Sequence, residues 1–288
     1  MYFTQKLFLI IKTIAHPFSN LFINLPNIMT KKLFLLPVLT LLISIGANAQ
    51  QQQMKHEETE LYTPVPAVVT PGKSCGDAPS DAIILFDGSN LNSWESANDT
   101  TKPADWVIKK GTLTVNKKAG SIQTKQRFMD YQIHVEWQEP KDIQGSDQAR
   151  GNSGLFLAST GKGDDGYEMQ ILDNYNNKTY TNGQAGSIYK QNAPLVNPNR
   201  PPGVWQSYDV VWTAPRFNED GTLKTPARVT AFFNGLLVQN NFELKGPTRF
   251  IGIPTYENGV RGPYPVKLQS HGDDSKPISF RNIWIRPL

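Results

Sequence analysis

The chain has 288 residues, with 29 Lys+Arg, 25 Asp+Glu, 22 Gly, 21 Pro and one Cys. Four lysines and no acidic residue lie within 1–49, so residues 50–288 carry 25 basic and 25 acidic side chains and are formally neutral. A neutral body lacks the basic stripe that neutralises phosphates, which argues against a nucleic-acid binder. The single cysteine excludes an intramolecular disulfide framework and a cysteine-cluster metal site.

Residues 1–49 are interpreted as a leader and signal peptide, with the true start at Met29. Two lysines precede an apolar run over 33–45, and a small-residue Ala-Asn-Ala pattern ends at Ala49, so cleavage is expected before Gln50. The apolar run is shorter than the roughly 20 residues that span a bilayer, so no stable membrane anchor is expected after cleavage. A bipartite leader is the alternative. We expect a periplasmic or secreted protein.

Residues 50–80 are Pro-rich without an apolar period and are predicted to be a flexible or extended tether. The hydrophobic period then becomes two, which predicts about ten to twelve short strands and an all-β, antiparallel sandwich of jelly-roll type over 81–288. An Asn-Gly pair between two apolar runs predicts a hairpin. The clearest strands are predicted over 82–86, 105–109, 112–116, 120–124, 130–137, 166–172, 207–213, 228–234, 236–239, 266–270 and 278–286.

Strand alternation selects the polar side chains that we expect to share one surface. In 130–137 and 166–172, apolar residues occupy one face of the strand and polar residues the other. In 266–270, two apolar residues likewise point to the core. The non-core faces then carry His134, Glu136, Glu168, Gln170, Lys267, Gln269 and His271. These strands are predicted to line a polar trough together.

Several of these residues also have a purely structural interpretation. Glu136 and Glu168 fit ordinary solvated strand residues, and His134 fits a surface residue. His271 stands at a strand end and fits a turn. Asp173 fits a turn that is capped by its own side chain, which is the interpretation we favour.

Six tryptophans invite a sugar-stacking interpretation, but about four of them are expected in the core. Trp205 and Tyr189 stand in loop contexts and are the better ligand candidates. The acid-rich stretch 163–177 is a candidate calcium site, since hard cations prefer oxygen ligands, although its spacing is irregular. Zinc, phosphate-loop and nucleophile-elbow motifs are absent from the sequence.

Five motifs occur in order along the chain: LFDGSNLNSW, GNSGLFL, GYEMQILD, AGSIYK and LQSHGDDSKPISFRNIWIRPL. Together they closely resemble the bacterial family of 3-keto-disaccharide hydrolases over residues 81–288. The resemblance implies the jelly roll of concanavalin A-like lectins and glucanases. It also implies an exported enzyme that acts on glycosides whose sugar is oxidised to a ketone at C3.

The resemblance further implies a polar signature at Asn152, Ser153, Glu168, Asp173, Tyr189, His271 and Arg281. Two departures from the family pattern concern the substrate contacts rather than the fold. An arginine commonly follows the NSG motif in the family and is missing here, and Ser270 replaces the aspartate of LQDHG.

A C3 ketone acidifies the proton at C2, so a base can remove it and expel the C1 substituent, after which water adds back. This chemistry needs a base, an acid and donors to the developing enolate. We expect His271 or Glu168 to be the base and the other to assist the leaving group, with Gln170, Asn152 or a divalent metal polarising the ketone. The substrate-binding set is predicted to be Glu136, Asn152, Ser153, Gln170, Asp173, Tyr189, Gln269 and Arg281.

Two other functions compete with this interpretation. A conventional glycosidase would use Glu136 and Glu168 as a carboxylate pair within roughly 5–10 Å. A lectin-like binding module would hold sugar without turnover. Carbohydrate is the expected partner in each case, no cofactor is required with certainty, and the sequence gives no indication of the oligomeric state.

Overall fold

The computed structural model describes residues 54–161, 163–256 and 262–288, so the predicted leader and signal peptide lie outside the described residues. The chain divides into two units, 1–66 and 67–288. Three short 3-10 turns occur in the described ranges: η1 (His56–Thr59), η2 (Asp147–Ala149) and η3 (Thr181–Gly183). Within those ranges, no helix is long and apolar enough to cross a membrane.

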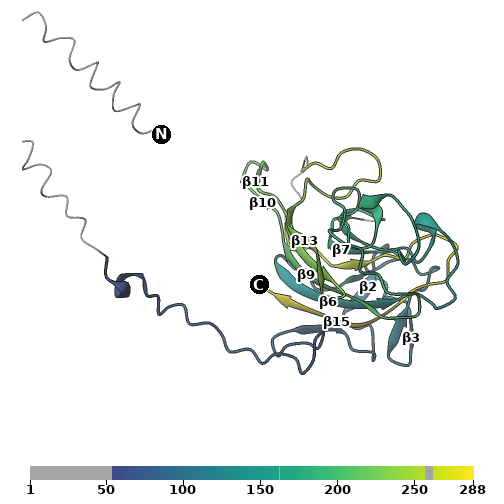
Figure 1. Ribbon diagram of the computed structural model, residues 1–288, viewed down its shortest axis with the longest axis horizontal. Helices are drawn as coiled ribbons and strands as arrows, with labels where there is room; N and C mark the ends of the chain where they lie inside the picture. Colours follow the sequence, from purple (N-terminus) through teal and green to yellow (C-terminus); the bar gives the residue numbers. More distant parts are fainter. Residues whose placement is uncertain (1–53, 162, 257–261) are drawn as a thin grey trace, which may run out of the picture. The chain divides into compact units, whose positions relative to one another are not determined.

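The second unit contains two large antiparallel β-sheets (Figure 1). The eight-stranded sheet runs in the order β13-β12-β9-β6-β15-β4-β3, and β1 pairs with the free part of β15. Its strands are β1 (Ile83–Phe86), β3 (Val107–Lys109), β4 (Thr112–Thr114), β6 (Tyr131–Gln138), β9 (Gln206–Thr213), β12 (Arg228–Phe233), β13 (Leu236–Glu243) and β15 (Ser279–Pro287).

The five-stranded sheet runs in the order β2-β5-β14-β7-β8. Its strands are β2 (Trp94–Ser96), β5 (Ile122–Thr124), β14 (Lys267–Leu268), β7 (Ser153–Ser159) and β8 (Gly166–Ile171). A small ribbon pairs β10 (Arg216–Phe217) with β11 (Leu223–Thr225). Because strands from distant parts of the chain pair in each sheet, the fold brings β8 and β14 into one surface although they are far apart in sequence.

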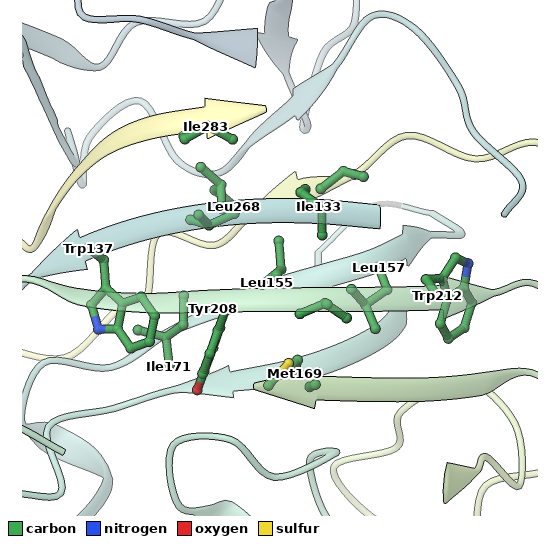
Figure 2. Close-up of a cluster of buried hydrophobic side chains, with 14 of the residues drawn as sticks. Ile133, Trp137, Leu155, Leu157, Met169, Ile171, Tyr208, Trp212, Leu268 and Ile283 are labelled. Atoms are coloured by element: carbon green, nitrogen blue, oxygen red, sulfur yellow. The ribbon is translucent and has the colours of Figure 1, made fainter. Parts of the chain in front are cut away.

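The core lies between the two sheets and is built by alternation. Inward side chains of β6 and β9 meet those of β7, β8 and β14 (Figure 2). They include Ile133, Trp137, Tyr208 and Trp212 from the large sheet, and Leu155, Leu157, Met169, Ile171 and Leu268 from the small one. Their burial supplies most of the favourable free energy of folding. The predicted all-β antiparallel sandwich of jelly-roll type is confirmed.

Turn chemistry accounts for the tight hairpins. Asn234 and Gly235 join β12 to β13 with φ values of 51° and 82°, the left-handed backbone that a two-residue hairpin of this type needs. Lys110 and Gly111 join β3 to β4 in the same way, with φ values of 50° and 75°. The sequence predicted a hairpin at the Asn-Gly pair, and the turn at Asn234 and Gly235 confirms it.

Fifteen strands occur in the described residues, more than the ten to twelve predicted. Strand β7 was not predicted, because every residue of its SGLFLAS sequence is buried and no polar alternation marks it. Five of the six tryptophans are buried rather than four, leaving only Trp205 partly exposed. The segment before β1 is not free along its whole length, since the Gly76 carbonyl accepts hydrogen bonds from Asn282 Nδ2 (2.9 Å) and Trp284 Nε1 (2.7 Å).

Candidate functional site

A cavity of about 470 Å³ opens on the outer face of the five-stranded sheet. It brings together six residues that the sequence singled out: Asn152, Glu168, Gln170, Tyr189, Gln269 and His271. Its walls come from the loop that joins β7 to β8 and from the loop that follows β13, and they contribute Asp164, Asp165, Pro247, Thr248, Arg249, Phe250 and Ile251. The cavity therefore combines a polar sheet face with walls of mixed character.

Strand β8 places its polar residues as predicted but does not leave them in solvent. Tyr167, Met169 and Ile171 point into the core, while Glu168 and Gln170 point into the cavity and are only 4% and 1% exposed. The edge of β8 is covered by residues 186–189, whose backbone exchanges hydrogen bonds with Glu168 and Gln170. The interpretation of Glu168 as a solvated strand residue is therefore wrong.

Glu168 is a buried acid that makes no ion pair with any charged side chain among the described residues. Burial, reinforced by the nearby Asp164 and only partly offset by Lys267, raises the pKa of Glu168 from 4.5 to about 8. The carboxyl rests over Gly154 on β7, where an added Cβ would lie 2.6 Å from Oε1. At neutral pH the side chain is mostly protonated and is a proton donor.

Lys267 explains how one cavity wall is held. Its side chain is fully buried, and Nζ donates to the carbonyl oxygens of Gly163 (2.6 Å) and Asp165 (3.2 Å). Nζ also lies 4.0 Å from the centre of the Phe156 ring, a cation–π contact. Burial lowers the pKa of Lys267 from 10.5 to about 8, while Glu168 and neighbouring aspartates oppose that shift. Lys267 thus anchors the loop that carries the acidic wall beside Glu168.

His271 is oriented by a buried carboxylate. Its Nδ1 lies 2.8 Å from Asp273 Oδ2, and its side chain is 34% exposed. Burial alone would raise the pKa of Asp273, but hydrogen bonds from His271 and Ser275 lower it to about 2. An ionised carboxylate accepts a hydrogen bond from the Nδ1–H group, and this tautomer leaves a lone pair on Nε2. The Asn152 amide nitrogen, 3.4 Å from Nε2, fits that assignment.

Side-chain amides connect the remaining floor of the cavity. Gln170 Nε2 donates to Asn152 Oδ1 (3.0 Å), and Asn152 Nδ2 donates to the Gln148 carbonyl (2.7 Å). The side-chain oxygens of Gln170 and Gln269 are buried without a hydrogen-bond partner among the described residues. Buried amide oxygens of this kind are suited to accept hydrogen bonds from the hydroxyl groups of a ligand.

Four predicted site residues do not line this cavity: Ser153, Asp173, Glu136 and Arg281. Ser153 alternates inward from Asn152, is buried, and donates through Oγ to the Gln269 carbonyl (2.7 Å). Asp173 lies beyond the end of β8, where Oδ1 accepts the Tyr175 backbone N–H (2.9 Å) and Oδ2 pairs with Arg150 (2.8 Å). Asp173 therefore caps the turn, the interpretation that we favoured.

Glu136 and Arg281 do not share the cavity with Glu168, which corrects the prediction of one common trough. Strands β6 and β15 pair with each other in the eight-stranded sheet, so their outward side chains lie on the opposite outer face of the sandwich. There Glu136 Oε2 pairs with Arg281 (2.6 Å), whose guanidinium lies 4.1 Å from the centre of the Trp205 ring. Alternation identified which residues face outward but not which sheet they belong to.

His134 lies on the same outer face as Glu136 and Arg281. It was predicted to be a surface residue, and that prediction is wrong. It is 2% exposed, with Nδ1 2.7 Å from Asp209 Oδ1 and its ring stacked on Trp284. Burial lowers the pKa of His134, but its hydrogen bonds to Asp209 and Glu136 outweigh that effect and raise it to about 9. Together with Arg281 these residues form a charge network that packs against the segment before β1.

Sequence reasoning missed the residues that complete the cavity. Asp273 follows His271 by two positions, and that spacing was the available signal. Asp164 and Phe250 come from loops whose paths are set by contacts with β8 and Lys267, which no local pattern encodes. Within the described ranges, no group of three or more His, Cys, Asp or Glu side chains is placed to hold a metal ion.

The arrangement supplies a base, an acid and hydrogen-bonding amides on one surface. His271 Nε2 is available to accept a proton, and Glu168 to donate one. Both groups line a cavity large enough for a sugar unit, together with Gln269. The geometry is therefore suited to proton transfers at neighbouring positions of a polyhydroxylated ligand.

Comparisons with known proteins give a family match and similar solved structures. Residues 81–286 match the family described as "3-keto-alpha-glucoside-1,2-lyase-like domain". A solved structure from Parabacteroides distasonis ATCC 8503, named as a candidate glycosyl hydrolase, is 53% identical, covers 82% of this chain and 97% of its own, and has a TM-score of 0.75.

Two more solved structures from that organism, also named as candidate glycosyl hydrolases, are 19% and 21% identical to this chain. Each covers 72% of this chain with a TM-score of 0.51, and the matches span 94% and 99% of their own chains. At this identity they show a shared fold alone. A comparison with curated proteins finds no match.

Proposed function

The chain belongs to the family of 3-keto-alpha-glucoside-1,2-lyase-like domains and is a carbohydrate-active enzyme, and we propose that it cleaves 3-keto-glycosides by elimination followed by hydration. The observation that carries the proposal is the presence of an oriented histidine base and a protonated carboxylic acid in one amide-lined cavity. His271, paired with Asp273, is the base, and Glu168 is the acid.

In the first step, His271 Nε2 removes the proton from C2 of the sugar. The electron pair of that C–H bond forms a double bond between C1 and C2, and the bond from C1 to the leaving oxygen breaks. Glu168 donates its proton to that oxygen, so the aglycone departs as a neutral alcohol. Water then adds across the double bond, with the hydroxyl group on C1 and the proton on C2, and the net reaction is hydrolysis.

The ketone at C3 makes the C2 proton acidic only if its oxygen is stabilised as charge develops. We assign that role to the side-chain NH2 group of Gln269, a hydrogen-bond donor on a residue that lines the cavity. Gln170 and Asn152 are engaged with each other and with Gln148, which makes them a scaffold for the floor.

The separation of Glu136 from Glu168 argues against the conventional glycosidase. That mechanism needs two carboxyl groups flanking one glycosidic bond, whereas these two lie on opposite outer faces of the sandwich. A lectin-like module would need neither an oriented histidine nor a carboxyl group held in its neutral form. The titratable groups in the cavity therefore favour an enzyme.

We also propose that the protein works in the periplasm or outside the cell. The support is the lysine pair, apolar run and Ala-Asn-Ala pattern that end at Ala49. Sequencing the N-terminus of the mature protein from its host tests this. A start at Gln50 supports export, and a mature protein that retains the segment contradicts it.

Incubation with a 3-keto-glucoside and with its unoxidised parent tests the proposed reaction. We expect turnover of the keto substrate alone, and its loss in both Glu168→Gln and His271→Ala. Arg281→Met, a change on the opposite outer face, is the control and should retain activity. Cleavage of the parent glycoside would overturn the elimination mechanism, and binding of both compounds without turnover would identify a binding module.

A further inference from the structure

An exposed apolar strip borders the polar cavity. Phe250, Ile251 and Ile253 are 69%, 84% and 78% exposed, and the first two line the cavity together with Glu168 and His271. Large apolar side chains clustered in solvent on a monomer commonly mark a place where something binds. We call these three residues the apolar lip.

Contacts from Lys190 and from strand β8 hold the loop that carries the apolar lip. Lys190 Nζ donates to the Phe250 carbonyl (2.7 Å) and lies 4.1 Å from the centre of its ring. The same ammonium lies 5.9 Å from the ring of Tyr189, another residue of the cavity lining. At the start of the loop, Thr248 accepts a hydrogen bond from the Glu168 backbone N–H (3.1 Å).

These contacts connect the lip to the residue that we assign as the acid. The backbone N–H of Thr248 also donates to the Gly166 carbonyl (2.7 Å), so the loop is bonded to β8 both at Gly166 and at Glu168 itself. If the keto-sugar binds over Glu168, its aglycone extends to the margin of the cavity and contacts the residues there. The lip is the apolar part of that margin, in contrast to Asp164 and Asp165 on another wall.

We propose that the apolar lip is an aglycone subsite that selects 3-keto-glycosides with a hydrocarbon-rich leaving group over those with a second sugar. The proposal rests on the proposed function for the identity of the sugar and leaving group. The polar floor offers amides and titratable groups for the keto-sugar, whereas the two isoleucines offer no partner for sugar hydroxyls. A cyclic hydrocarbon at this margin would remove Ile251 and the Phe250 ring from water.

Three 3-keto-glucosides of one anomer test the subsite, with methyl, cyclohexylmethyl and glucosyl aglycones. All three leave as alcohols, so differences in leaving-group acidity are small and the contacts of the aglycone dominate. Removing a methylene group from water contributes about fourfold to binding. We therefore expect kcat/KM for the cyclohexylmethyl substrate to exceed that for the other two by tenfold or more.

The variants Phe250→Ser and Ile251→Ser should lower the ratio of kcat/KM for the cyclohexylmethyl substrate to kcat/KM for the methyl substrate at least severalfold. Phe232→Ser is the matched control, because Phe232 is an exposed aromatic residue (39%) on β12 of the other sheet and should leave the preference intact. Equal turnover of the cyclohexylmethyl and methyl substrates, or a preference that survives both lip variants, overturns the subsite. A preference for the glucosyl aglycone overturns it as well.

Binding of the unoxidised cyclohexylmethyl and methyl glucosides, measured by calorimetry or ligand-observed NMR, separates the two proposals. Tighter binding of the cyclohexylmethyl compound, lost in Phe250→Ser but not in Phe232→Ser, supports the subsite even if no keto substrate is cleaved. In that case the proposed reaction fails and the subsite stands. Equal affinities for the two glucosides overturn the subsite whatever the reaction proves to be.

Discussion

Replacing Glu168 with glutamine should stabilise the fold increasingly as the pH rises, because glutamine keeps the shape of the protonated acid and cannot ionise. In the folded protein burial raises the pKa of Glu168 to about 8, against 4.5 for the free group. The proton held by the folded state contributes stability that is fully present below pH 4.5 and is lost as the pH rises through about 8.

The size of the effect follows from these two pKa values. At 1.36 kcal/mol per pKa unit, the wild-type protein loses about 1 kcal/mol of stability from this group at pH 5 and about 3 kcal/mol at pH 7. The glutamine variant avoids that loss, so its free energy of unfolding relative to wild type should rise by on the order of 2 kcal/mol between these pH values.

Urea denaturation followed by tryptophan fluorescence at pH 5, 6, 7 and 8 measures the difference between the two proteins. Comparing variant with wild type at each pH cancels the contributions of the other titrating groups. Glu243→Gln is the control, because its carboxylate is more than half exposed on β13. A difference between Glu168→Gln and wild type that stays constant with pH would refute the assignment of Glu168 as a neutral buried acid.

Other predictions concern the neighbours of the two proposed catalytic groups. Asp273→Asn should reduce kcat on the order of a hundredfold, because it removes the carboxylate that orients His271. Steady-state kinetics on the keto substrate measures this effect. An unchanged kcat would show that Asp273 has no role in the reaction. Wild-type kcat/KM should fall as the pH rises through about 8, where Glu168 loses its proton. The Lys267→Met variant should move that fall to higher pH, because the ammonium group of Lys267 lowers the pKa of Glu168. A fall that moves to lower pH in the variant would contradict this coupling between Lys267 and Glu168. Glu136→Gln should leave kcat/KM unchanged but lower the melting temperature at pH 7, since the hydrogen bonds from His134 and Asn282 outweigh burial and hold the pKa of Glu136 near 2. That contribution is present above pH 4.5 and is lost as the pH falls, so the variant and wild type should converge in acid.

Local pattern was sufficient to predict which side of a strand carries the chemistry. The alternation of β8 separates Tyr167, Met169 and Ile171 from Glu168 and Gln170, and the structure has the two sets on opposite faces. The Asn-Gly hairpin follows in the same way from two residues with positive φ. These predictions succeed because side-chain alternation and turn geometry are set within a few residues.

Sheet membership could not be predicted by this route. Glu136 and Glu168 have the same pattern around them, yet β6 and β8 pair in different sheets and the two carboxylates face away from each other. The burial of Glu168 depends on residues 186–189 covering the edge of β8, and on a loop around Thr248 that bonds to it. Such long-range contacts decide the pKa of the acid, and no short stretch of sequence contains them.

The most direct test of the central claim is a kinetic isotope effect with a 3-keto-glucoside that carries deuterium at C2. If the proton at C2 is removed by His271 in the step that expels the aglycone, kcat/KM should fall severalfold for the deuterated substrate. An unoxidised glucoside should not react. Equal rates for the two isotopic substrates, together with cleavage of the unoxidised glucoside, would show that the glycosidic bond breaks without loss of the C2 proton and would contradict the account.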